Sequence, residues 1–313
     1  MRPLLIASRL LAGLLPAAIP AAATSAAART LAVGPGAPYP TLAAAAAAAR
    51  AGDTVAIGPG DFGCAVWRAD RLTIAGAGMD ATRIRGPACA GKGLFVTEGR
   101  DITVRDLALI GAAVPDHNGA GIRAEGANLT VARVRFEDDQ NGILAAADPR
   151  STLTVRDSLF LRDGACIGAC AHGLYADRVG RLVVAGSRFT ATRQGHHIKS
   201  RALATEITGC DIEDGPDGTS SYLIDIPNGG AATIRGNRLE KGPRTENRST
   251  AIMIGEEGAK NPTPAITVAG NDFRNASGTP TVFVRNRTAT PAALSGNTLS
   301  GPVIPLAGPG TVQ

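Results

Sequence analysis

One short segment concentrates the reactive side chains of this 313-residue chain: His196, His197, Lys199 and Arg201 lie within six residues. An arginine fork matches the two oxygens of a carboxylate, and a lysine flanked by cations can act as a general base. Such a set could neutralise the carboxylate of a uronate sugar and remove the proton from its C5 carbon. His197 or Tyr175 could then protonate the departing oxygen, which completes a β-elimination.

The elements that carry these residues come from a motif that repeats about nine times. Each copy opens with a triplet of mainly aliphatic residues and Thr, and the copies start 23 to 34 residues apart. The triplets begin at Leu72, Ile102, Leu129, Leu153, Leu182, Thr205, Ala232, Ile266 and Ala292. Short segments rich in Val, Ile and Thr and bounded by Gly, Asn and Asp indicate strands rather than helices. A period in this range predicts a stacked solenoid, so each repeat is expected to form one coil of an all-β, parallel β-helix.

A second strand in each coil should place the reactive residues on one face. Its expected inward positions form one stack, made of Ile122, Ile143, Leu174, Ile198, Ile224 and Ile252. Because side chains alternate between the two faces of a strand, the intervening residues should point outward, on coils about 4.8 Å apart. The sequence therefore predicts a continuous polar patch that contains Tyr175, Asp177, Lys199, Arg201 and Asp225.

The patch and its surroundings divide into residues expected to act on a substrate and residues expected to hold it. The predicted catalytic side chains are Lys199, Arg201, His197 and Tyr175. The predicted substrate-binding side chains are Asp225, Asp177, His196 and Arg123. Alternation along the strand places His197 on the outward side with Lys199 and Arg201, and His196 on the inward side or in the preceding corner.

The N-terminal part of the chain differs from the repeats. Residues 1–28 begin with a basic region, continue with a short apolar stretch broken by prolines and end in small residues. This pattern predicts a secretory signal and a secreted or periplasmic protein, and the stretch is shorter than the roughly 20 residues of a membrane span. An alanine-rich capping helix is expected over about 41–51, with Thr41 as its N-cap. Residues 29–313 are expected to form one domain, with coils over about 53–300.

Five cysteines in a secreted chain permit disulfides and leave one thiol over. Cys64 and Cys89 lie 25 residues apart, about one coil, so stacking could bring them within bridging distance. Cys166 and Cys170 flank a three-residue loop. That loop could be closed by a disulfide, or its thiols could contribute to a metal site.

One coil position carries Cys210 and, in three later repeats, Asn237, Asn271 and Asn297. Recurrence of asparagine at one level of a solenoid favours a structural ladder of side-chain amides over a set of ligands. Cys210 is accordingly expected to be a buried free thiol.

The start of the repeats resembles the N-terminal cap of right-handed parallel β-helix proteins of the pectate-lyase-like superfamily. The resemblance rests on Tyr39-Pro-Thr-Leu, Gly52-Asp-Thr-Val and Pro59-Gly-Asp-Phe, and it continues through the repeats to about Leu299. It implies the right-handed parallel β-helix fold with a short N-terminal capping helix. It implies function only loosely, since the superfamily contains lyases, hydrolases, epimerases, tailspikes and adhesins.

A local resemblance concerns Ile198-Lys199-Ser200, which is similar to the strand that carries the lysine base in β-helical alginate lyases and chondroitinase B. In those families, acidic residues on the neighbouring coil bind calcium that grips the uronate. This chain has only Asp177 at the matching place, with Tyr175 where another acid would be expected. Calcium is therefore implied as a cofactor only through Asp177.

Three functions are compatible with the patch. The leading hypothesis is a lyase or C5-epimerase that acts on an acidic polysaccharide. A non-catalytic glycan-binding or structural cell-envelope protein would use the same patch only to hold an anionic chain. A polygalacturonase-like hydrolase is the third hypothesis, because Asp138-Asp139 and Gly195-His196 resemble parts of that family, although its other motifs are missing. An inverting hydrolase needs two carboxylates about 6.5–9.5 Å apart.

The charge pattern bears on partners. Formal net charge is +5, but basic and acidic residues alternate throughout the chain. This distribution lacks the clustered basic surface of a nucleic-acid-binding protein. The expected partner is an acidic polysaccharide, and the protein is expected to be a monomer.

Overall fold

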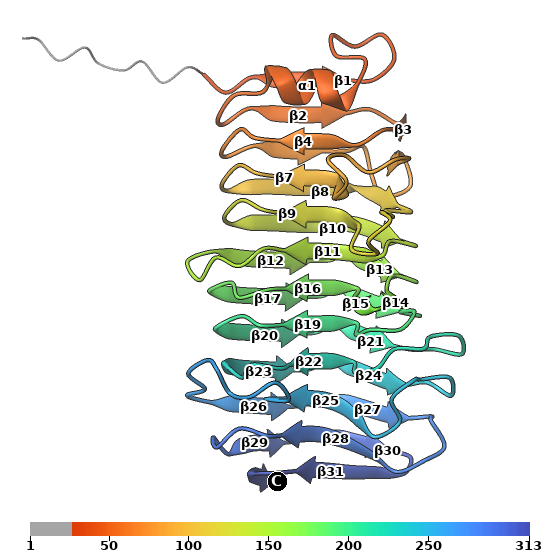
Figure 1. The fold of residues 1–313 in the computed structure, drawn as a ribbon, viewed down its shortest axis with the longest axis vertical. Helices are drawn as coiled ribbons and strands as arrows, with labels where there is room; N and C mark the ends of the chain where they lie inside the picture. The colour runs from red at the N-terminus through yellow and green to blue at the C-terminus, as the bar shows by residue number, and fades with distance from the viewer. Residues whose placement is uncertain (1–26) are drawn as a thin grey trace, which may run out of the picture.

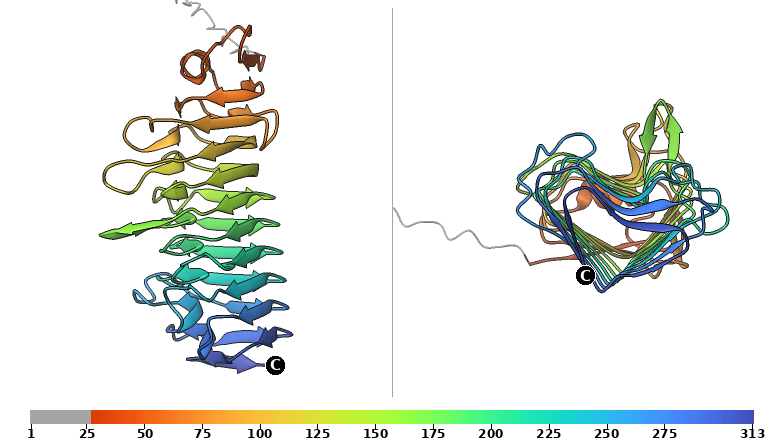
Figure 2. Two further views of the ribbon diagram at one scale, coloured as in Figure 1. Left: turned by 90° about the vertical axis from the view of Figure 1, so that its right-hand side faces the viewer. Right: turned by 90° about the horizontal axis from the view of Figure 1, so that it is seen from below.

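A computed structural model describes residues 27–313, which form one stack of β-coils (Figure 1). Seen along the stack, successive coils superimpose around a common interior, and a hairpin projects from one side (Figure 2). The predicted secretory signal lies outside the described residues except for its last two positions. Among residues 27–313, no helix has the length and apolar character needed to cross a membrane.

Two sheets run along the stack, one with 20 strands and one with 10. The larger sheet contains β1 (Thr30–Val33), β2 (Thr54–Ile57), β3 (Gly60–Phe62), β5 (Thr73–Ala75), β6 (Thr82–Arg85), β8 (Ile102–Ile110), β10 (Leu129–Glu137), β12 (Thr152–Arg156), β13 (Leu159–Leu161), β17 (Arg181–Ala185), β18 (Arg188–Thr190), β20 (Ala204–Thr208), β21 (Asp211–Glu213), β23 (Ala231–Arg235), β24 (Arg238–Lys241), β26 (Ile266–Ala269), β27 (Asp272–Asn275), β29 (Ala292–Ser295), β30 (Thr298–Ser300) and β32 (Gly310–Val312). The smaller sheet contains β4 (Ala65–Trp67), β7 (Gly93–Thr97), β9 (Ala120–Ala124), β11 (Asn141–Ala145), β16 (Leu174–Ala176), β19 (Ile198–Ser200), β22 (Ile224–Ile226), β25 (Thr250–Ile254), β28 (Thr281–Asn286) and β31 (Val303–Ala307). The hairpin consists of β14 (Ala165–Ile167) and β15 (Ala169–Ala171).

The predicted repeat alignment is confirmed in the larger sheet. Leu129 pairs with Ile102 on one side and with Leu153 on the other, in parallel strands. The same register continues through the later triplets to Ala292. The chain is thus an all-β parallel solenoid with one short helix, as the repeat predicts.

The second strand of each coil also has its predicted register. In the smaller sheet, Ile198 pairs with Leu174 and with Ile224, and all three side chains are buried. Between the two sheets, the rings of Phe136, Phe160 and Phe189 stack on successive coils, with centroids 4.5 and 4.2 Å apart. A rigid, continuously packed interior therefore fixes the positions of outward side chains on the smaller sheet.

The predicted ends of the coil region need correction. Helix α1 (Leu42–Ala48) begins as predicted, with the Thr41 hydroxyl accepting from the Ala44 amide at 3.2 Å, but it ends before residue 51. Asp53 draws the chain out of the helix, because its buried carboxylate accepts the backbone N–H of Arg50 at 2.9 Å. Coils also begin earlier than residue 53, since β1 precedes the helix (Figure 1), and end later than residue 300, since β32 pairs with β29.

Both predicted cysteine pairs form disulfides. Cys64 and Cys89 lie on neighbouring coils, with Cα atoms 5.6 Å apart. Cys166 and Cys170 join β14 to β15, so their sulfur atoms are not available as metal ligands. Cys210 is a buried free thiol, as predicted.

The asparagine ladder is also present, and it gives a stability prediction. Asn271 donates to the Asn297 side chain at 2.9 Å and accepts from the Asn237 side chain at 2.9 Å. We expect Asn271→Ala to lower the free energy of unfolding by about 1–3 kcal/mol, because buried amides lose their partners. Denaturant unfolding measures this loss, and Ser295→Ala is the control, since the Ser295 side chain makes no hydrogen bond in the described structure. Equal stability of the two variants would contradict the prediction.

Candidate functional site

The outer face of the smaller sheet brings together four of the predicted site residues. Tyr175 on β16 pairs with Lys199 on β19, which pairs with Asp225 on β22. Lys199 Nζ donates to Asp225 Oδ2 at 3.0 Å. Arg201, just after β19, donates from Nη1 to the Tyr175 hydroxyl at 2.5 Å. Three successive coils therefore converge on one polar cluster, as strand alternation predicts.

A second carboxylate, that of Glu257, completes this cluster. Arg201 Nη2 lies 2.5 and 2.6 Å from the two carboxylate oxygens of Glu257, and Lys199 Nζ lies 3.3 Å from one of them. No sequence pattern places Glu257 in the site. It lies 56 residues from Arg201, on a loop after β25, and no spacing rule indicates which way that loop folds. The hydrogen-bond partners of Lys199 are therefore two carboxylates, those of Asp225 and Glu257.

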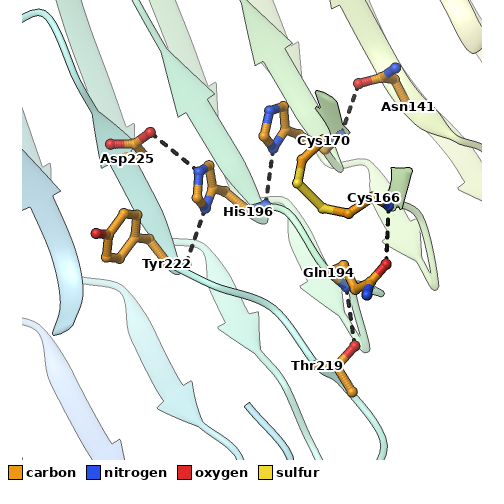
Figure 3. Close-up of a disulfide and its surroundings, with 9 residues drawn as sticks. Asn141, Cys166, Cys170, Gln194, His196, Thr219, Tyr222 and Asp225 are labelled. Atoms are coloured by element: carbon orange, nitrogen blue, oxygen red, sulfur yellow. Dashed lines mark hydrogen bonds and ion pairs between the residues drawn. A yellow bond between two sulfur atoms is a disulfide. The ribbon is translucent and has the colours of Figure 1, made fainter. Parts of the chain in front are cut away.

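His196 lies beside the cluster, in a corner that precedes β19 (Figure 3). Its Nδ1 accepts the backbone N–H of Tyr222 at 3.1 Å, and its Nε2 lies 3.4 Å from Asp225 Oδ2. A backbone N–H can only donate, so Nδ1 is unprotonated and the ring is neutral with its proton on Nε2. Burial likewise lowers the pKa of His196 well below its ordinary value. His196 thus faces the cluster with a neutral ring, whose Nε2–H lies near Asp225.

His172 follows the same pattern one coil earlier. Its Nδ1 accepts the backbone N–H of His196 at 3.0 Å, and the two rings stack with centroids 4.8 Å apart. Burial lowers the pKa of His172 to about 3. The two rings therefore form a neutral wall beside Tyr175, whose ring meets His172 edge-on.

His197 is not where alternation places it. It is fully buried, with Nε2 3.0 Å from Asp214 Oδ1 and Nδ1 2.7 Å from the Thr192 hydroxyl. The reason is local: β19 starts at Ile198, so the period-2 alternation does not extend back into the corner. The prediction of His197 as a catalytic acid is wrong, because the ring cannot reach a substrate on the outer face.

Asp225 occupies an unusual environment for a carboxylate. It is only 3% exposed, and its Oδ1 has no hydrogen-bond partner in the described structure. Burial raises the pKa of Asp225 to about 6, although Lys199 opposes the shift. The group can therefore change its charge in the mildly acidic to neutral range.

This environment predicts a pH-dependent stability. A carboxyl whose pKa is raised on folding favours the folded state most below the unfolded pKa of about 3.9, and this contribution is lost as pH rises through 6. Between pH 4 and pH 7, we expect wild type to lose roughly 2 kcal/mol of unfolding free energy relative to Asp225→Asn. Urea unfolding of both proteins at the two pH values measures this. Parallel pH dependence of the two proteins would contradict it.

Arg123 and Asp177 lie beside the cluster rather than in it. Together with Tyr175 they line a hollow of about 390 Å³, which is also bordered by Cys170 of the hairpin. Arg123 lies 3.6 Å from Glu125, and the Asp177 carboxylate accepts the backbone N–H of Arg178 at 2.8 Å. The hollow adjoins the cluster through Tyr175, so the two predicted binding residues border a neighbouring part of the same surface.

The acidic pair of the hydrolase hypothesis lies elsewhere. Asp138 is paired with Arg162 at 2.9 Å and with Arg193 at 2.7 Å. Asp139 is buried, and its Oδ1 accepts from the backbone of Ala112. Burial, together with the nearby Asp163, raises the pKa of Asp139 well above its ordinary value. An enclosed carboxyl and an ion-paired one do not form two carboxylates flanking a sugar bond.

The acidic side chains near the cluster do not form a calcium site. In the part of the chain that the structure describes, no three His, Cys, Asp or Glu side chains are grouped so as to hold a metal ion. The hollow that Asp177 lines contains one other acidic side chain, Asp116. Calcium prefers six to eight oxygen ligands, which is more than these acidic side chains provide.

Comparisons with known proteins concern the fold. No protein-family model matches the chain, and no curated protein sequence matches it. The solved alginate lyase from Paenibacillus sp. str. FPU-7 is 14% identical, over 90% of this chain and 99% of that chain, with a TM-score of 0.50. The A-module of the mannuronan C-5 epimerase AlgE4 from Azotobacter vinelandii is 17% identical, over 87% and 93%, with a TM-score of 0.42. The pectin methylesterase PemA from Erwinia chrysanthemi is 11% identical, over 90% and 81%, with a TM-score of 0.40. The chain therefore has a parallel β-helix fold, which it shares with the Paenibacillus alginate lyase.

Proposed function

We propose that this protein is a secreted carbohydrate-active enzyme that removes the C5 proton of a uronate in an acidic polysaccharide, as a lyase or a C5-epimerase. The observation that carries the proposal is the convergence of Arg201, Lys199 and Tyr175 on one outer face. These side chains supply a carboxylate-binding group, a base and an acid. The Paenibacillus protein that shares the fold is an alginate lyase, as its name states.

Arg201 would bind the uronate carboxylate. Its guanidinium already holds a carboxylate, that of Glu257, through short charge-assisted contacts to both oxygens. Removal of the C5 proton leaves an electron pair that delocalises into the adjoining carboxyl group. A cation fixed at that group therefore stabilises the charge that develops in the transition state.

Lys199 would act as the base. Its Nζ shares a hydrogen bond with Asp225 Oδ2, and the neutral form of Asp225 is accessible because burial raises the pKa of this carboxyl to about 6. Transfer of the shared proton to Asp225 leaves a neutral amine on the outer face, which can accept the C5 proton. The His196 Nε2–H, near the same carboxylate oxygen, would orient Asp225 for this transfer.

Tyr175 would act as the acid. Burial raises the pKa of Tyr175, so the phenol keeps its proton at neutral pH. Since its oxygen accepts from Arg201, its own O–H is free to donate outward. Of the two acids considered from the sequence, His197 and Tyr175, only Tyr175 lies on the outer face.

The two reactions share the first step and differ in the second. In elimination, the electron pair left at C5 forms a double bond to C4 and expels the C4 oxygen, which takes the proton of Tyr175. In epimerisation, a water molecule on the opposite face gives a proton to C5, and no chain bond breaks. The proton taken up by Lys199 then returns through solvent to the hydroxide that this water leaves. Alginate and polygalacturonate incubated with the protein therefore distinguish them: ultraviolet absorbance detects an unsaturated uronate, and proton NMR detects an inverted one. A polymer unchanged by both criteria would contradict the proposed activity.

A glycan-binding protein without catalysis is the second candidate. It is favoured by the two ion pairs of Lys199, which make this side chain a donor to carboxylates in the structure. In that case, Arg201 and Lys199 would only attract an anionic chain. Substitution of Lys199 separates the two candidates, as argued in the Discussion.

A further inference from the structure

The cluster on β19 and β22 has balanced charge. It contains two cations, Lys199 and Arg201, and two carboxylates, Asp225 and Glu257, joined by contacts of 2.5 to 3.3 Å. A substrate carboxylate added to this set would leave an excess of negative charge in a half-buried site. Its entry therefore requires that one of the resident carboxylates leave or become neutral.

Of the two carboxylates, Glu257 is the one that can leave. Asp225 is a strand residue that is 3% exposed, whereas the Glu257 side chain is 37% exposed. Rotation of the Glu257 side chain into solvent breaks its contacts with Arg201 and Lys199 without disturbing a strand. A uronate carboxylate could make the same contacts with Arg201 and Lys199, since it is a planar carboxylate like that of Glu257.

The backbone holds Glu257 in place for this role. It belongs to a tight turn between two glycines in the left-handed region, Gly255 (φ 84°) and Gly258 (φ 86°), with the Gly258 N–H donating to the Gly255 carbonyl at 3.1 Å. The Glu257 N–H donates to the Pro227 carbonyl at 2.9 Å. Farther along the loop, the buried Asn261 side chain donates to the Arg201 carbonyl at 3.1 Å. The turn is thus tied to the same coil as the cations, and only the side chain needs to move.

We propose that the Glu257 carboxylate occupies the position on Arg201 at which the substrate carboxylate binds, and that a polyuronate binds by displacing Glu257. This inference rests on the proposed function, because it assumes that the ligand is a uronate chain. It assigns Glu257 a role in specificity. A neutral sugar hydroxyl competes weakly with Glu257 for the Arg201 guanidinium, because Glu257 contacts it through both carboxylate oxygens. A uronate carboxylate can replace the Arg201–Glu257 ion pair with an equivalent ion pair to Arg201.

The neighbouring residue provides a matched control. Glu256 lies in the same turn, but its carboxylate is 2.9 Å from Arg287 and makes no contact with the cluster. Glu256→Gln and Glu257→Gln remove the same charge from adjacent positions. A general change in electrostatic attraction would therefore change the oligouronate affinity of both variants alike. Freeing the binding position on Arg201 would change the affinity of the Glu257 variant only.

The test is a titration of fluorescently labelled alginate and polygalacturonate oligomers at fixed ionic strength. We expect Glu257→Gln and Glu257→Ala to lower the Kd for at least one of these oligouronates about 10-fold, and Glu256→Gln to change it less than about 3-fold. Thermal melting of each variant confirms that the fold is intact, and Glu257→Ala serves if glutamine retains a hydrogen bond to Arg201.

Three results would overturn the inference: equal tightening by the Glu256 and Glu257 variants, unchanged or weaker binding by the Glu257 variants, or no oligouronate binding by any of the proteins. Catalysis is scored separately, by release of the C5 proton. Tighter binding by the Glu257 variants without any proton release would keep this inference and reject the proposed enzyme. Proton release by wild type without tighter binding by the Glu257 variants would keep the proposed enzyme and reject this inference.

Discussion

Lys199→Ala is expected to lower the rate of C5 proton release from a polyuronate by about 10²–10⁴-fold, which is the usual contribution of a general base. The side chain projects from β19 between Tyr175 and Asp225, and it is the lysine of the cluster. Alanine removes the amine but leaves the strand and its inward neighbours, Ile198 and Ser200, in place. The rate of appearance of C5-derived label in water measures the effect.

Lys199→Arg decides between the enzyme and the binding protein. Arginine keeps the positive charge but does not lose its proton in proteins, so it cannot serve as a base. We expect this variant to retain binding to oligouronates and to lose proton release to the same extent as Lys199→Ala. Lys260→Ala, on the exposed part of the loop, is the control and should behave as wild type. Activity retained by Lys199→Arg would remove Lys199 from the role of base.

Asp214→Ala is expected to lower the free energy of unfolding by about 3–5 kcal/mol. Asp214 is fully buried and accepts hydrogen bonds from the Ser220 hydroxyl at 2.5 Å and from the Gly242 amide at 3.0 Å. It also lies 3.0 Å from His197 Nε2 and 3.9 Å from the buried Lys241 Nζ. Without this carboxylate, the Ser220 hydroxyl and the Gly242 amide lose their acceptor inside the solenoid. The buried Lys241 keeps its hydrogen bond to the Ser221 carbonyl but loses the negative charge beside it.

The pKa values of Asp214 and Lys241 determine how this contribution to the free energy of unfolding depends on pH. Although burial raises it, hydrogen bonding to His197 and the charge of Lys241 bring the pKa of Asp214 down to about 2. Its contribution is therefore present above the unfolded pKa of about 3.9 and is lost as pH falls toward 2. Burial lowers the pKa of Lys241 to about 8, so its unfavourable contribution is relieved as pH rises from 8 toward its unfolded value.

Denaturant unfolding at pH 7 measures the Asp214 effect, and Asp217→Ala is the control. Asp217 is 79% exposed and lies 3.7 Å from Arg244, so its replacement should cost less than about 0.5 kcal/mol. A similar small loss in both variants would mean that the buried cluster contributes little to stability. A large loss only in Asp214→Ala would support a structural role for His197 and its partners.

The regular parts of this molecule could be predicted from the sequence because period-2 alternation and a recurring coil length constrain them. Ile198 and its neighbours in the stack were predicted to be inward, and Lys199 outward, and both predictions are confirmed by the strand register. Parallel pairing at one level of successive coils requires the same register in every repeat, so an error in one coil would conflict with its neighbours. This is why Tyr175, Lys199 and Asp225 could be placed side by side.

Positions outside the strands could not be predicted in the same way. His197 lies one residue before β19, where the backbone turns and alternation no longer applies, and its ring points inward to Asp214. Glu257 reaches Arg201 only because glycines at 255 and 258 allow a tight turn and Asn261 ties the loop down. Such long-range contacts depend on the path of one loop, which neither composition nor spacing specifies.

The most direct test of the central claim is release of tritium into water from alginate and polygalacturonate labelled at C5. Both elimination and epimerisation break this carbon–hydrogen bond, so the measurement does not depend on which product forms. We expect wild type to release tritium from at least one of the two polymers, and Lys199→Ala to lose this release. Oligouronate binding without tritium release would contradict the claim and would make Lys199 and Arg201 ligands for an anionic glycan rather than parts of an active site.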